Sequence, residues 1–255
     1  MERKQDYIAV FDSGVGGISV LRHLCRLLPC ERFLYFGDSA NAPYGTRPTG
    51  QICDLTLEAA EKLMVRGSKA LVVACNTATA AAIEALRNRY PNKIIIGIEP
   101  ALKPAADKFP GGCIGVMGTP ATLRENKFAH QLEIYGAKCQ VVKLPAPGLV
   151  ELIEAGQADS EEARQLLRNL LEPWSDKLDA LVLGCTHYPF AVEAIRDVLG
   201  ERTLLLDGGE GTARETKRRL AEADLLREGH GEVILENSSA NPEMIALSRR
   251  LLEQS

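Results

Sequence analysis

Two cysteines, Cys75 and Cys185, stand in the same local setting, and thiols in such a setting can move protons or attack a substrate. Each follows an apolar run, residues 70–74 and 181–184, and each is followed by two polar residues. This pattern predicts a buried strand, a tight turn and a helix start. Each thiol is therefore expected at the carboxyl edge of a parallel sheet, where ligand sites of open α/β sheets lie. A helix N-terminus favours a thiolate, so we also expect it to lower the pKa of each cysteine.

Three simple uses of two such thiols can be weighed against the residues. The spacing allows a disulfide, but no CxxC or resolving-cysteine motif supports a redox role. A metal site is not expected, because Cys185 and His187 are two residues apart and four well-spaced ligands are not visible. Nucleophilic catalysis needs one cysteine, a base and an oxyanion hole, and it leaves the second cysteine without a role.

A fourth use engages both thiols. Two acid/base groups on opposite faces of a carbon can remove a proton on one side and return one on the other, which inverts a stereocentre. One cysteine must then be a thiolate while the other is a thiol, so each needs local tuning of its pKa. Asp12 near Cys75 and His187 near Cys185 are suitable partners for this tuning.

Alternating strands and helices must position these residues. Strands are expected over residues 7–11, 33–36, 70–74, 94–98, 113–117, 141–144, 181–184, 203–206 and 232–235. Helices are expected over residues 18–28, 52–65, 79–90, 101–108, 123–135, 161–171, 191–199, 212–223 and 242–253. This alternation predicts an α/β fold with mostly parallel sheets flanked by helices and joined by right-handed crossovers.

The order of the elements also indicates an internal duplication. Residues 8–13 resemble residues 114–119, an offset of 106, and the two cysteines are 110 residues apart. Nearly equal offsets predict two similar lobes. We expect residues 1–97 and 208–255 to form the lobe that carries Cys75, and residues 98–207 to form the lobe that carries Cys185. The active site is expected in the cleft between them.

Two loops at strand ends offer further groups to a ligand. Residues 12–17, Asp-Ser-Gly-Val-Gly-Gly, form a turn whose glycines let a small ligand approach the backbone, although the pattern is not that of a dinucleotide-binding loop. Residues 37–45 form a long mixed loop that contains Tyr44, and such a loop is more often functional than a plain connection. Asp38 is expected to do no more than cap or brace this loop.

The composition is that of an ordinary globular protein. The 255 residues are 45% hydrophobic and 25% charged with a net charge of −4, which gives no reason to expect nucleic acid as a partner. No apolar stretch approaches the roughly 20 residues of a membrane span, and residues 1–6 lead into too short an apolar run for a secretory signal. Seven cysteines without CxxC spacing indicate reduced thiols and a cytoplasmic location.

The remaining cysteines and most histidines are expected to take no part in chemistry. The other cysteines are interpreted as small hydrophobic residues. They are Cys25, Cys30, Cys53, Cys113 and Cys139. Three histidines are expected at the surface without partners. They are His23, His130 and His230.

Five short motifs, taken together, resemble a known family. They are residues 12–17, residues 37–38 with 43–45, Cys-Asn-Thr-Ala at 75–78, Gly-Thr at 118–119 with Thr122, and Gly-Cys-Thr-His-Tyr-Pro at 184–189. In this order they resemble the glutamate racemases of the cofactor-independent aspartate/glutamate racemase superfamily. The His-Tyr-Pro sequence favours the glutamate branch over the aspartate racemases. The resemblance implies an isomerase that interconverts L- and D-glutamate without a cofactor and supplies D-glutamate for bacterial peptidoglycan.

The resemblance also implies roles for individual residues. Cys185 would take the α-proton from L-glutamate, and Cys75 would take it from D-glutamate. Asp12, Glu154 and His187 would assist, with Glu151 as the alternative to Glu154. The implied substrate contacts are Asp12, Ser13, Tyr44, Gly45, Asn76, Thr77, Thr186 and His187. Glutamate is the expected partner, and a homodimer is a possible assembly.

The chain departs from the family pattern in three places. Glu125 and Phe128 stand where the family often has serine and tyrosine, and Gly208 stands where it often has serine or proline. The chain is expected to lack the long N-terminal extension that the resemblance links, in some members, to activation by a cell-wall precursor. We therefore expect no such activation.

Three rival functions remain open from the sequence. A two-lobed amino-acid-binding protein would bind glutamate but exchange no α-proton. A single-cysteine hydrolase or lyase would form a covalent adduct and leave one of the two cysteines dispensable. An aspartate racemase would differ only in the length of its substrate, so turnover assays with both amino acids separate it from a glutamate racemase.

Overall fold

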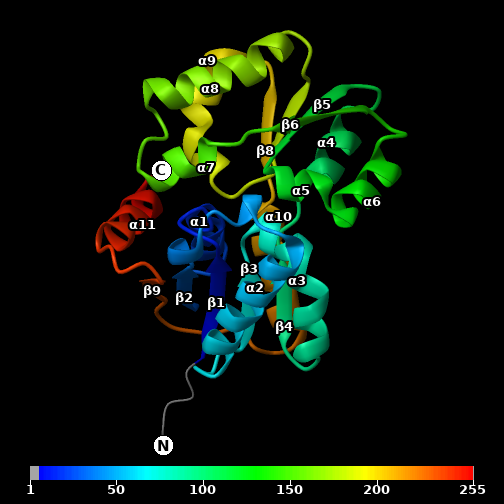
Figure 1. Ribbon diagram of the computed structural model, residues 1–255. Helices are drawn as coiled ribbons and strands as arrows, with labels where there is room; N and C mark the ends of the chain where they lie inside the picture. Colours follow the sequence, from blue (N-terminus) through cyan, green and yellow to red (C-terminus); the bar gives the residue numbers. More distant parts are fainter. Residues whose placement is uncertain (1–5, 255) are drawn as a thin grey trace, which may run out of the picture.

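The computed structural model describes residues 6–254, which form two lobes, one above the other in Figure 1. Each lobe is built around a parallel sheet with helices on both faces, so the predicted fold class is confirmed. Residues 1–5, where no secretory signal is expected, lie outside the described residues, as does residue 255.

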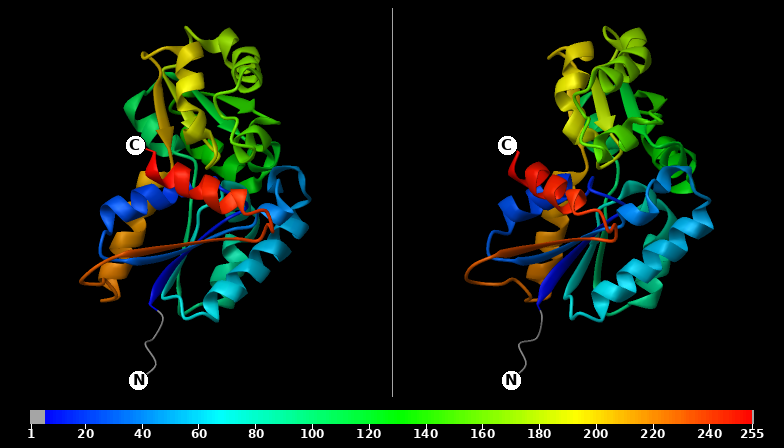
Figure 2. Two further views of the ribbon diagram at one scale, coloured as in Figure 1. Left: turned by 90° about the vertical axis from the view of Figure 1, so that its left-hand side faces the viewer. Right: turned by 60° about the vertical axis from the view of Figure 1, so that its left-hand side comes forward.

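The first lobe contains a five-stranded sheet in the order β4-β3-β1-β2-β9. Its strands are β1 (Tyr7–Asp12), β2 (Arg32–Gly37), β3 (Ala70–Val73), β4 (Ile94–Gly97) and β9 (Glu232–Asn237). Its helices are α1 (Ile18–Leu27), α2 (Thr49–Met64), α3 (Asn76–Arg89), α10 (Gly209–Glu222) and α11 (Glu243–Glu253), with 3₁₀ turns η1 (Ser39–Asn41) and η2 (Tyr44–Thr46). Strand β9 brings the C-terminal part of the chain back to the edge of this sheet, beside β2 (Figure 2).

The second lobe contains a four-stranded sheet in the order β6-β5-β7-β8. Its strands are β5 (Cys113–Gly118), β6 (Gln140–Pro145), β7 (Ala180–Leu183) and β8 (Leu204–Asp207). Its helices are α4 (Leu102–Lys108), α5 (Pro120–Arg124), α6 (Asn126–Tyr135), α7 (Leu149–Glu154), α8 (Glu161–Leu171) and α9 (Val192–Leu199), with 3₁₀ turns η3 (Glu172–Trp174) and η4 (Tyr188–Ala191).

The sheets are held between two apolar layers because successive side chains of a strand point to opposite faces. In β1, Ile8 and Val10 pack into one apolar cluster, whereas Ala9 and Phe11 pack into the cluster on the other face. Full burial of an aliphatic side chain of this size contributes about 1.5–3 kcal/mol. The strand ends that carry the site are therefore anchored on both sides.

The two sheets repeat one topology, which confirms the predicted duplication. Read from its other edge, the second sheet is β8-β7-β5-β6, and it matches β4-β3-β1-β2 of the first. The register repeats as well, since Ile8 faces Ala70 where β1 pairs with β3, and Ile114 faces Ala180 where β5 pairs with β7. The duplication places both cysteine-bearing strands at equivalent interior positions of their sheets.

The chain passes from the first lobe to the second after β4 and returns after β8. The two connecting segments touch, because a Cβ atom added to Gly208 would collide with the carbonyl oxygen of Glu99. This close approach explains why a residue without a side chain stands at position 208. The predicted lobe boundaries after residues 97 and 207 stay a prediction.

One predicted helix is wrong in its extent. Residues 123–135 do not form a single helix, because Glu125 is extended and separates α5 from α6. Helix α5 also begins earlier than the apolar spacing predicts, since Thr119 caps it by accepting the N–H of Thr122 at 3.1 Å. A capping residue sets a helix start, whereas apolar spacing marks only the residues that face the core.

The helix after the second cysteine also differs from the prediction. The 3₁₀ turn η4 precedes α9, so Cys185 does not lie directly at the start of an α-helix. Cys75, in contrast, is the N-cap residue of α3, which begins at Asn76 rather than at residue 79. The two thiols therefore have equivalent strand positions but different turns.

Two histidines that were expected to lack partners have them. His23 Nε2 lies 3.9 Å from Asp207 Oδ1, which links α1 to the end of β8 in the other lobe. His130 Nδ1 lies 3.5 Å from Glu133 Oε2 on the same helix. The prediction is wrong for His23 because the sequence does not show that α1 lies beside the end of the second sheet.

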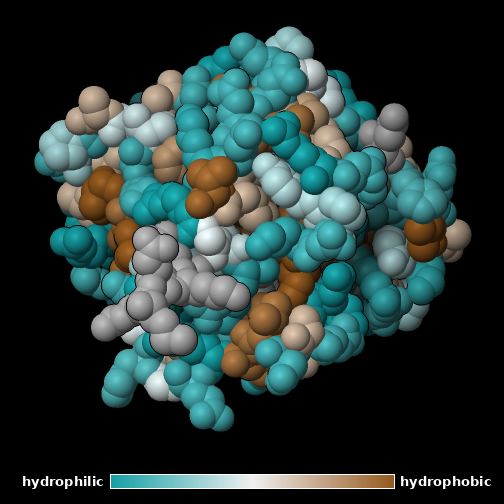
Figure 3. All heavy atoms as spheres, turned by 90° about the horizontal axis from the view of Figure 1, so that it is seen from below, coloured by the Kyte–Doolittle hydropathy of each residue, from teal (hydrophilic) through white to brown (hydrophobic). Residues whose placement is uncertain are grey.

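Within residues 6–254, no helix has both the length and the apolar character needed to cross a membrane. Figure 3 views the free end of the first lobe and shows a mostly hydrophilic face with separate apolar areas. The large apolar side chains that are exposed on the whole described chain are Val65, Ile134, Leu225, Leu226 and Val233.

Candidate active site

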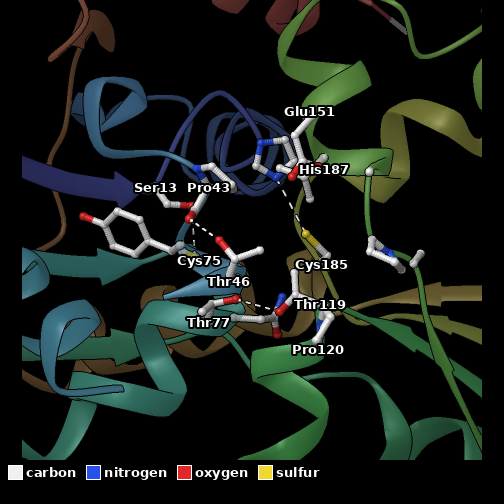
Figure 4. Close-up of a pocket in the computed structure, with 17 residues that line it drawn as sticks. Ser13, Pro43, Thr46, Cys75, Thr77, Thr119, Pro120, Glu151, Cys185 and His187 are labelled. Atoms are coloured by element: carbon white, nitrogen blue, oxygen red, sulfur yellow. Dashed lines mark hydrogen bonds between the residues drawn. The ribbon is translucent and has the colours of Figure 1, made fainter. Parts of the chain in front are cut away.

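Cys75 and Cys185 occupy equivalent positions just beyond β3 and β7. The residues before them, Ala74 and Gly184, each donate their N–H to the adjacent strand at 2.7 Å. Both thiols are free and nearly buried, with exposed fractions of 5% and 7%. They reach one cavity from different lobes and lie on opposite sides of it (Figure 4).

The cavity between the lobes encloses about 520 Å³ of empty space, its open mouth included. Eight of the predicted site residues line it. They are Ser13, Tyr44, Gly45, Cys75, Asn76, Thr77, Cys185 and His187. The other predicted residues, Asp12, Glu154 and Thr186, do not line the cavity. Glu154 contacts His187, which lines it, whereas Asp12 and Thr186 contact each other.

Several residues that line the cavity are missing from the sequence-based prediction. They are Pro43, Thr46, Thr119, Pro120, Ala146, Pro147, Gly148 and Val150. Thr119 could have been found, because it follows Ser13 by the same 106 residues that relate the two halves. The wall from residues 146–150 carries no sequence signal, since its side chains are small or apolar and its position depends on how the lobes pack.

Three threonine hydroxyls join the lobes at one end of the cavity. Thr77 Oγ1 lies 3.1 Å from both Thr119 Oγ1 and Thr122 Oγ1. Thr77 belongs to the first turn of α3 in the first lobe, whereas the other two lie at the start of α5 in the second. Hydroxyl donors and the N–H groups of a helix N-terminus are suited to bind a carboxylate.

The surroundings of Cys75 favour its protonated form. Its Sγ lies 3.4 Å from Ser13 Oγ and accepts the N–H of Ala78 at 3.4 Å. Burial, and to a smaller extent the charge of Asp12, raise the pKa of Cys75 to about 12. The hydrogen bonds with Ser13 and Ala78 lower this pKa only in part. The expected lowering of the pKa is therefore wrong for Cys75, because burying a thiolate costs more than the helix N-terminus contributes.

Cys185 faces a basic partner. Its Sγ lies 3.7 Å from His187 Nδ1, and His187 Nε2 lies 2.6 Å from Glu154 Oε1. Burial lowers the pKa of His187, but its hydrogen bonds to Cys185 and Glu154 outweigh burial and hold the pKa well above the ordinary value. Burial raises the pKa of Glu154, but the hydrogen bond from His187 and two further donors bring it below the ordinary value. His187 is thus held as an imidazolium that can donate to a thiolate at Cys185.

Asp12 connects the first lobe to the turn that carries Cys185. Thr186 Oγ1 donates to Asp12 Oδ2 at 2.9 Å, and the N–H of Gly14 donates to Oδ1 at 2.8 Å. The carboxyl group is fully buried, so its pKa is raised, although the charge of His187 lowers it. The predicted contacts of Asp12 and Thr186 with substrate stay a prediction.

The two candidate acids of α7 occupy different places. Glu154 reaches His187, as described above, and also accepts the N–H of Val15 at 2.6 Å. Glu151 instead lines the cavity. The geometry therefore favours Glu154 as the partner of His187, and it leaves Glu151 free to meet a ligand.

The loop after β2 delivers Tyr44 and Gly45 to the cavity. Tyr44 donates its hydroxyl to Asp38 Oδ2 at 2.7 Å, and Asn41 Nδ2 donates to the same carboxylate at 3.1 Å. Asp38 braces the loop in this way. Gly45 lies so close to Thr119 that an added Cβ would be 2.9 Å from the threonine Cβ, so the loop reaches the second lobe.

A carbon atom bound between the two sulfur atoms would have a protonated thiol on one side and, on the other, a sulfur atom beside an imidazolium that can support it as a thiolate. Such a pair can take a proton from one face of the carbon and return one to the opposite face. In the described part of the chain, no group of three or more His, Cys, Asp or Glu side chains is placed to hold a metal ion. The fold and the site together suit an isomerase that uses two acid/base groups.

Comparisons with known proteins agree with this class. The family model described as Asp/Glu/Hydantoin racemase matches residues 29–216. A glutamate racemase from Clostridium perfringens is 46% identical over 249 residues, which cover 96% of each chain. The crystal structure of a glutamate racemase from Bacillus anthracis matches with a TM-score of 0.88 at 32% identity, covering 99% of this chain and 96% of that one. The crystal structure of the Francisella tularensis glutamate racemase in complex with D-glutamate matches with a TM-score of 0.85 at 28% identity, covering 99% and 95%.

The chain belongs to the Asp/Glu/Hydantoin racemase family. The resemblance to glutamate racemases that the five motifs indicate is confirmed over the full length of the chain. The protein is therefore an isomerase of this family.

Proposed function

We propose that this protein interconverts L- and D-glutamate by a two-base mechanism without a cofactor. The observation that carries the proposal is the placement of two buried thiols, from equivalent strand ends of two lobes, on opposite sides of one cavity. Its relatives of similar sequence and fold are glutamate racemases, and one of them holds D-glutamate.

In the direction from L- to D-glutamate, Cys185 acts as the base. A thiolate at Cys185, paired with the His187 imidazolium, takes the α-proton and leaves a carbanion next to the substrate carboxylate. Cys75, which burial keeps as a thiol, returns a proton to the opposite face. In the reverse direction Cys75 is the base and Cys185 is the acid. The raised pKa of Cys75 supports a resting enzyme prepared for L-glutamate.

The polar groups that line the cavity are proposed to hold the substrate. Ser13, Asn76 and Thr77 supply a hydroxyl, an amide and a second hydroxyl on the side of Cys75. Asn76 Oδ1 is buried and has no hydrogen-bond partner within the described residues, so it can accept from the substrate ammonium group. Tyr44 and Gly45 close the cavity from the loop after β2.

We further infer that the product serves bacterial cell-wall synthesis in the cytoplasm, where D-glutamate is built into peptidoglycan. The absence of any disulfide among the seven cysteines fits a reducing compartment. A homodimer stays an expectation.

The first test is circular dichroism of L- and D-glutamate solutions in deuterated water, with wild type, Cys75→Ala and Cys185→Ala. Wild type is expected to remove the optical activity of both enantiomers and to place deuterium at Cα. Each variant is expected to racemise glutamate about 100-fold to 10,000-fold more slowly than wild type, because a positioned acid or base usually contributes a factor of this size. Because the enantiomers have equal free energies, kcat/KM must fall equally in both directions.

Controls separate this function from its rivals. Cys53→Ala, which changes a half-buried cysteine of α2 outside the cavity, is expected to keep full activity. Binding of glutamate without loss of optical activity would indicate a binding protein. Full racemisation by Cys75→Ala or Cys185→Ala would exclude the two-thiol mechanism. Faster turnover of aspartate than of glutamate would show that aspartate is the preferred substrate.

A further inference from the structure

Ser39 connects the last strand of the first lobe to the charged group behind Cys185. Ser39 Oγ donates to Glu154 Oε2 at 3.1 Å and accepts from Asn237 Nδ2 at 2.9 Å. Ser39 follows β2 and begins η1, whereas Asn237 ends β9, which pairs with β2 at the edge of the sheet. Three segments that are far apart in sequence therefore meet at one hydroxyl group.

The hydrogen-bond pattern leaves one orientation for this hydroxyl. Asn237 Oδ1 accepts the N–H of Ser239 at 2.8 Å, so the amide presents its Nδ2 to Ser39. The oxygen of Ser39 is then an acceptor, and its single proton is available to Glu154. The side chain of Asn237 thus decides that Ser39 donates to the carboxylate.

The carboxylate of Glu154 has donors on both oxygens as a result. Oε1 accepts from the Val15 N–H and from His187 Nε2, each at 2.6 Å, and Oε2 accepts from Ser39. The other ring nitrogen of His187 lies 3.7 Å from Cys185 Sγ. A carboxylate held at both oxygens cannot rotate freely, so it also holds the histidine ring that it binds.

We propose that Ser39, held by Asn237, is a positioning residue that orients Glu154 and, through it, the His187 ring against Cys185. Ser39 is not among the residues that line the cavity, so it acts on the reactivity of Cys185 and not by touching substrate. The inference rests on the proposed function only because that function makes Cys185 a catalytic base.

A merely structural role would look different. The loop that begins at Ser39 also carries Tyr44, which lines the cavity, so loosening the loop would disturb both sides of the site. A positioning role through Glu154 affects Cys185 alone, because Cys75 has its own contacts to Ser13 and Ala78. The reactivities of the two thiols therefore distinguish the roles.

The experiment measures how fast iodoacetamide alkylates each cysteine of the free enzyme between pH 6 and pH 10, with the modified peptides resolved by mass spectrometry. Ser39→Ala is expected to slow alkylation of Cys185 near neutral pH by about threefold to tenfold, the effect of one hydrogen bond of ordinary strength. Its pH profile should move to higher pH, because a less firmly held imidazolium supports the thiolate less well. The profile of Cys75 should not move.

Matched variants make the result specific. Asn237→Ala is expected to give a smaller change in the same direction, because Ser39 keeps its hydroxyl but loses the partner that orients it. Ser39→Thr, which keeps the hydroxyl, should restore most of the wild-type profile. Ser238→Ala serves as the control, since Ser238 Oγ accepts the N–H of Ala40 in the same loop but does not contact Glu154.

Two outcomes would overturn the proposal. One is a change at Cys185 in Ser39→Ala no larger than in Ser238→Ala, and the other is an equal change at Cys75. The alkylation assay needs no turnover, so it tests Ser39 even if the wild type fails to racemise glutamate. Failure to racemise glutamate would overturn the proposed function but not the positioning role of Ser39. If the function stands, kcat/KM should fall by the same factor as the alkylation rate, with KM nearly unchanged.

Discussion

Each of the two thiols has a different charged neighbour. Cys75 lies near the carboxyl group of Asp12, which disfavours a second negative charge, whereas Cys185 lies 3.7 Å from a ring nitrogen of His187. At one pH, the first thiol can therefore be an acid while the second is a base.

The contact between Glu154 and His187 leads to a prediction about pH. Glu154→Gln keeps the size of the side chain but removes its charge, so the raised pKa of His187 should fall. As the pH rises, His187 then loses its proton at a lower pH and no longer supports a thiolate at Cys185. We expect kcat/KM to fall by about 10-fold to 100-fold and its alkaline limb to move to lower pH, measured by racemisation at a series of pH values.

Glu151→Gln is the matched control, because it makes the same chemical change one helical turn away. Glu151 lines the cavity, so its substitution should alter KM and leave the alkaline limb in place. The reverse result, with the limb shifted in Glu151→Gln and not in Glu154→Gln, would give the assisting role to Glu151.

At the scale of elements, the turn between β1 and α1 is shaped by groups from the other lobe. A Cβ atom on Gly14 would overlap Glu154 Oε1, and one on Gly16 would overlap His187 Nδ1. Neither glycine is among those with a positive φ. The close approach of the second lobe therefore explains the glycines, and the backbone conformation does not.

Gly16→Ala should accordingly displace the His187 ring while leaving the fold in place. We expect kcat to fall by about 100-fold, as for a misplacement of about 1 Å, and the free energy of unfolding to fall by about 1–3 kcal/mol from overpacking. Racemisation rates and urea denaturation measure the two effects. Gly50→Ala, where an added Cβ meets nothing within 4 Å, should change neither. A fully active Gly16→Ala would show that the ring position has little influence.

At the scale of the whole molecule, the site exists only where the two lobes meet. Each lobe supplies one thiol, and the lobes are joined by two connecting segments that pack against each other at Gly208 and Glu99. The distance between the thiols therefore depends on the angle at these segments. Contacts between the lobes away from these segments also fix the angle between the lobes. In one of them, Thr49 Oγ1 donates to Glu125 Oε1 at 2.7 Å.

Gly208→Ala tests this dependence. The new methyl group must push against the carbonyl oxygen of Glu99, so we expect KM to rise several-fold and stability to fall by about 1–3 kcal/mol. Gly211→Ala in the adjacent helix meets nothing within 4 Å and should be neutral or stabilise by about 0.5–1 kcal/mol. Steady-state kinetics and denaturation of both variants check this. An unchanged KM in Gly208→Ala would show that the lobe angle does not depend on this contact.

The sequence by itself determined the features that depend on neighbouring residues. The apolar runs before Cys75 and Cys185 predict buried strands, because a strand covered on both faces must be apolar throughout. The repeat of 106 to 110 residues predicts two similar lobes, and the matching registers of the two sheets confirm it. The same patterns and motifs identified eight of the residues that line the cavity.

Only the tertiary structure decided the features that depend on residues far apart in the chain. The pairing of His187 with Glu154, the link from Asn237 through Ser39 and the contact of Thr119 with Thr77 all join separate elements. The state of Cys75 belongs to this group too, since its pKa is raised by burial. Burial depends on how the lobes and helices pack together. Local spacing in a sequence carries no measure of that packing, so it placed the thiols correctly but gave the wrong direction for the pKa of one of them.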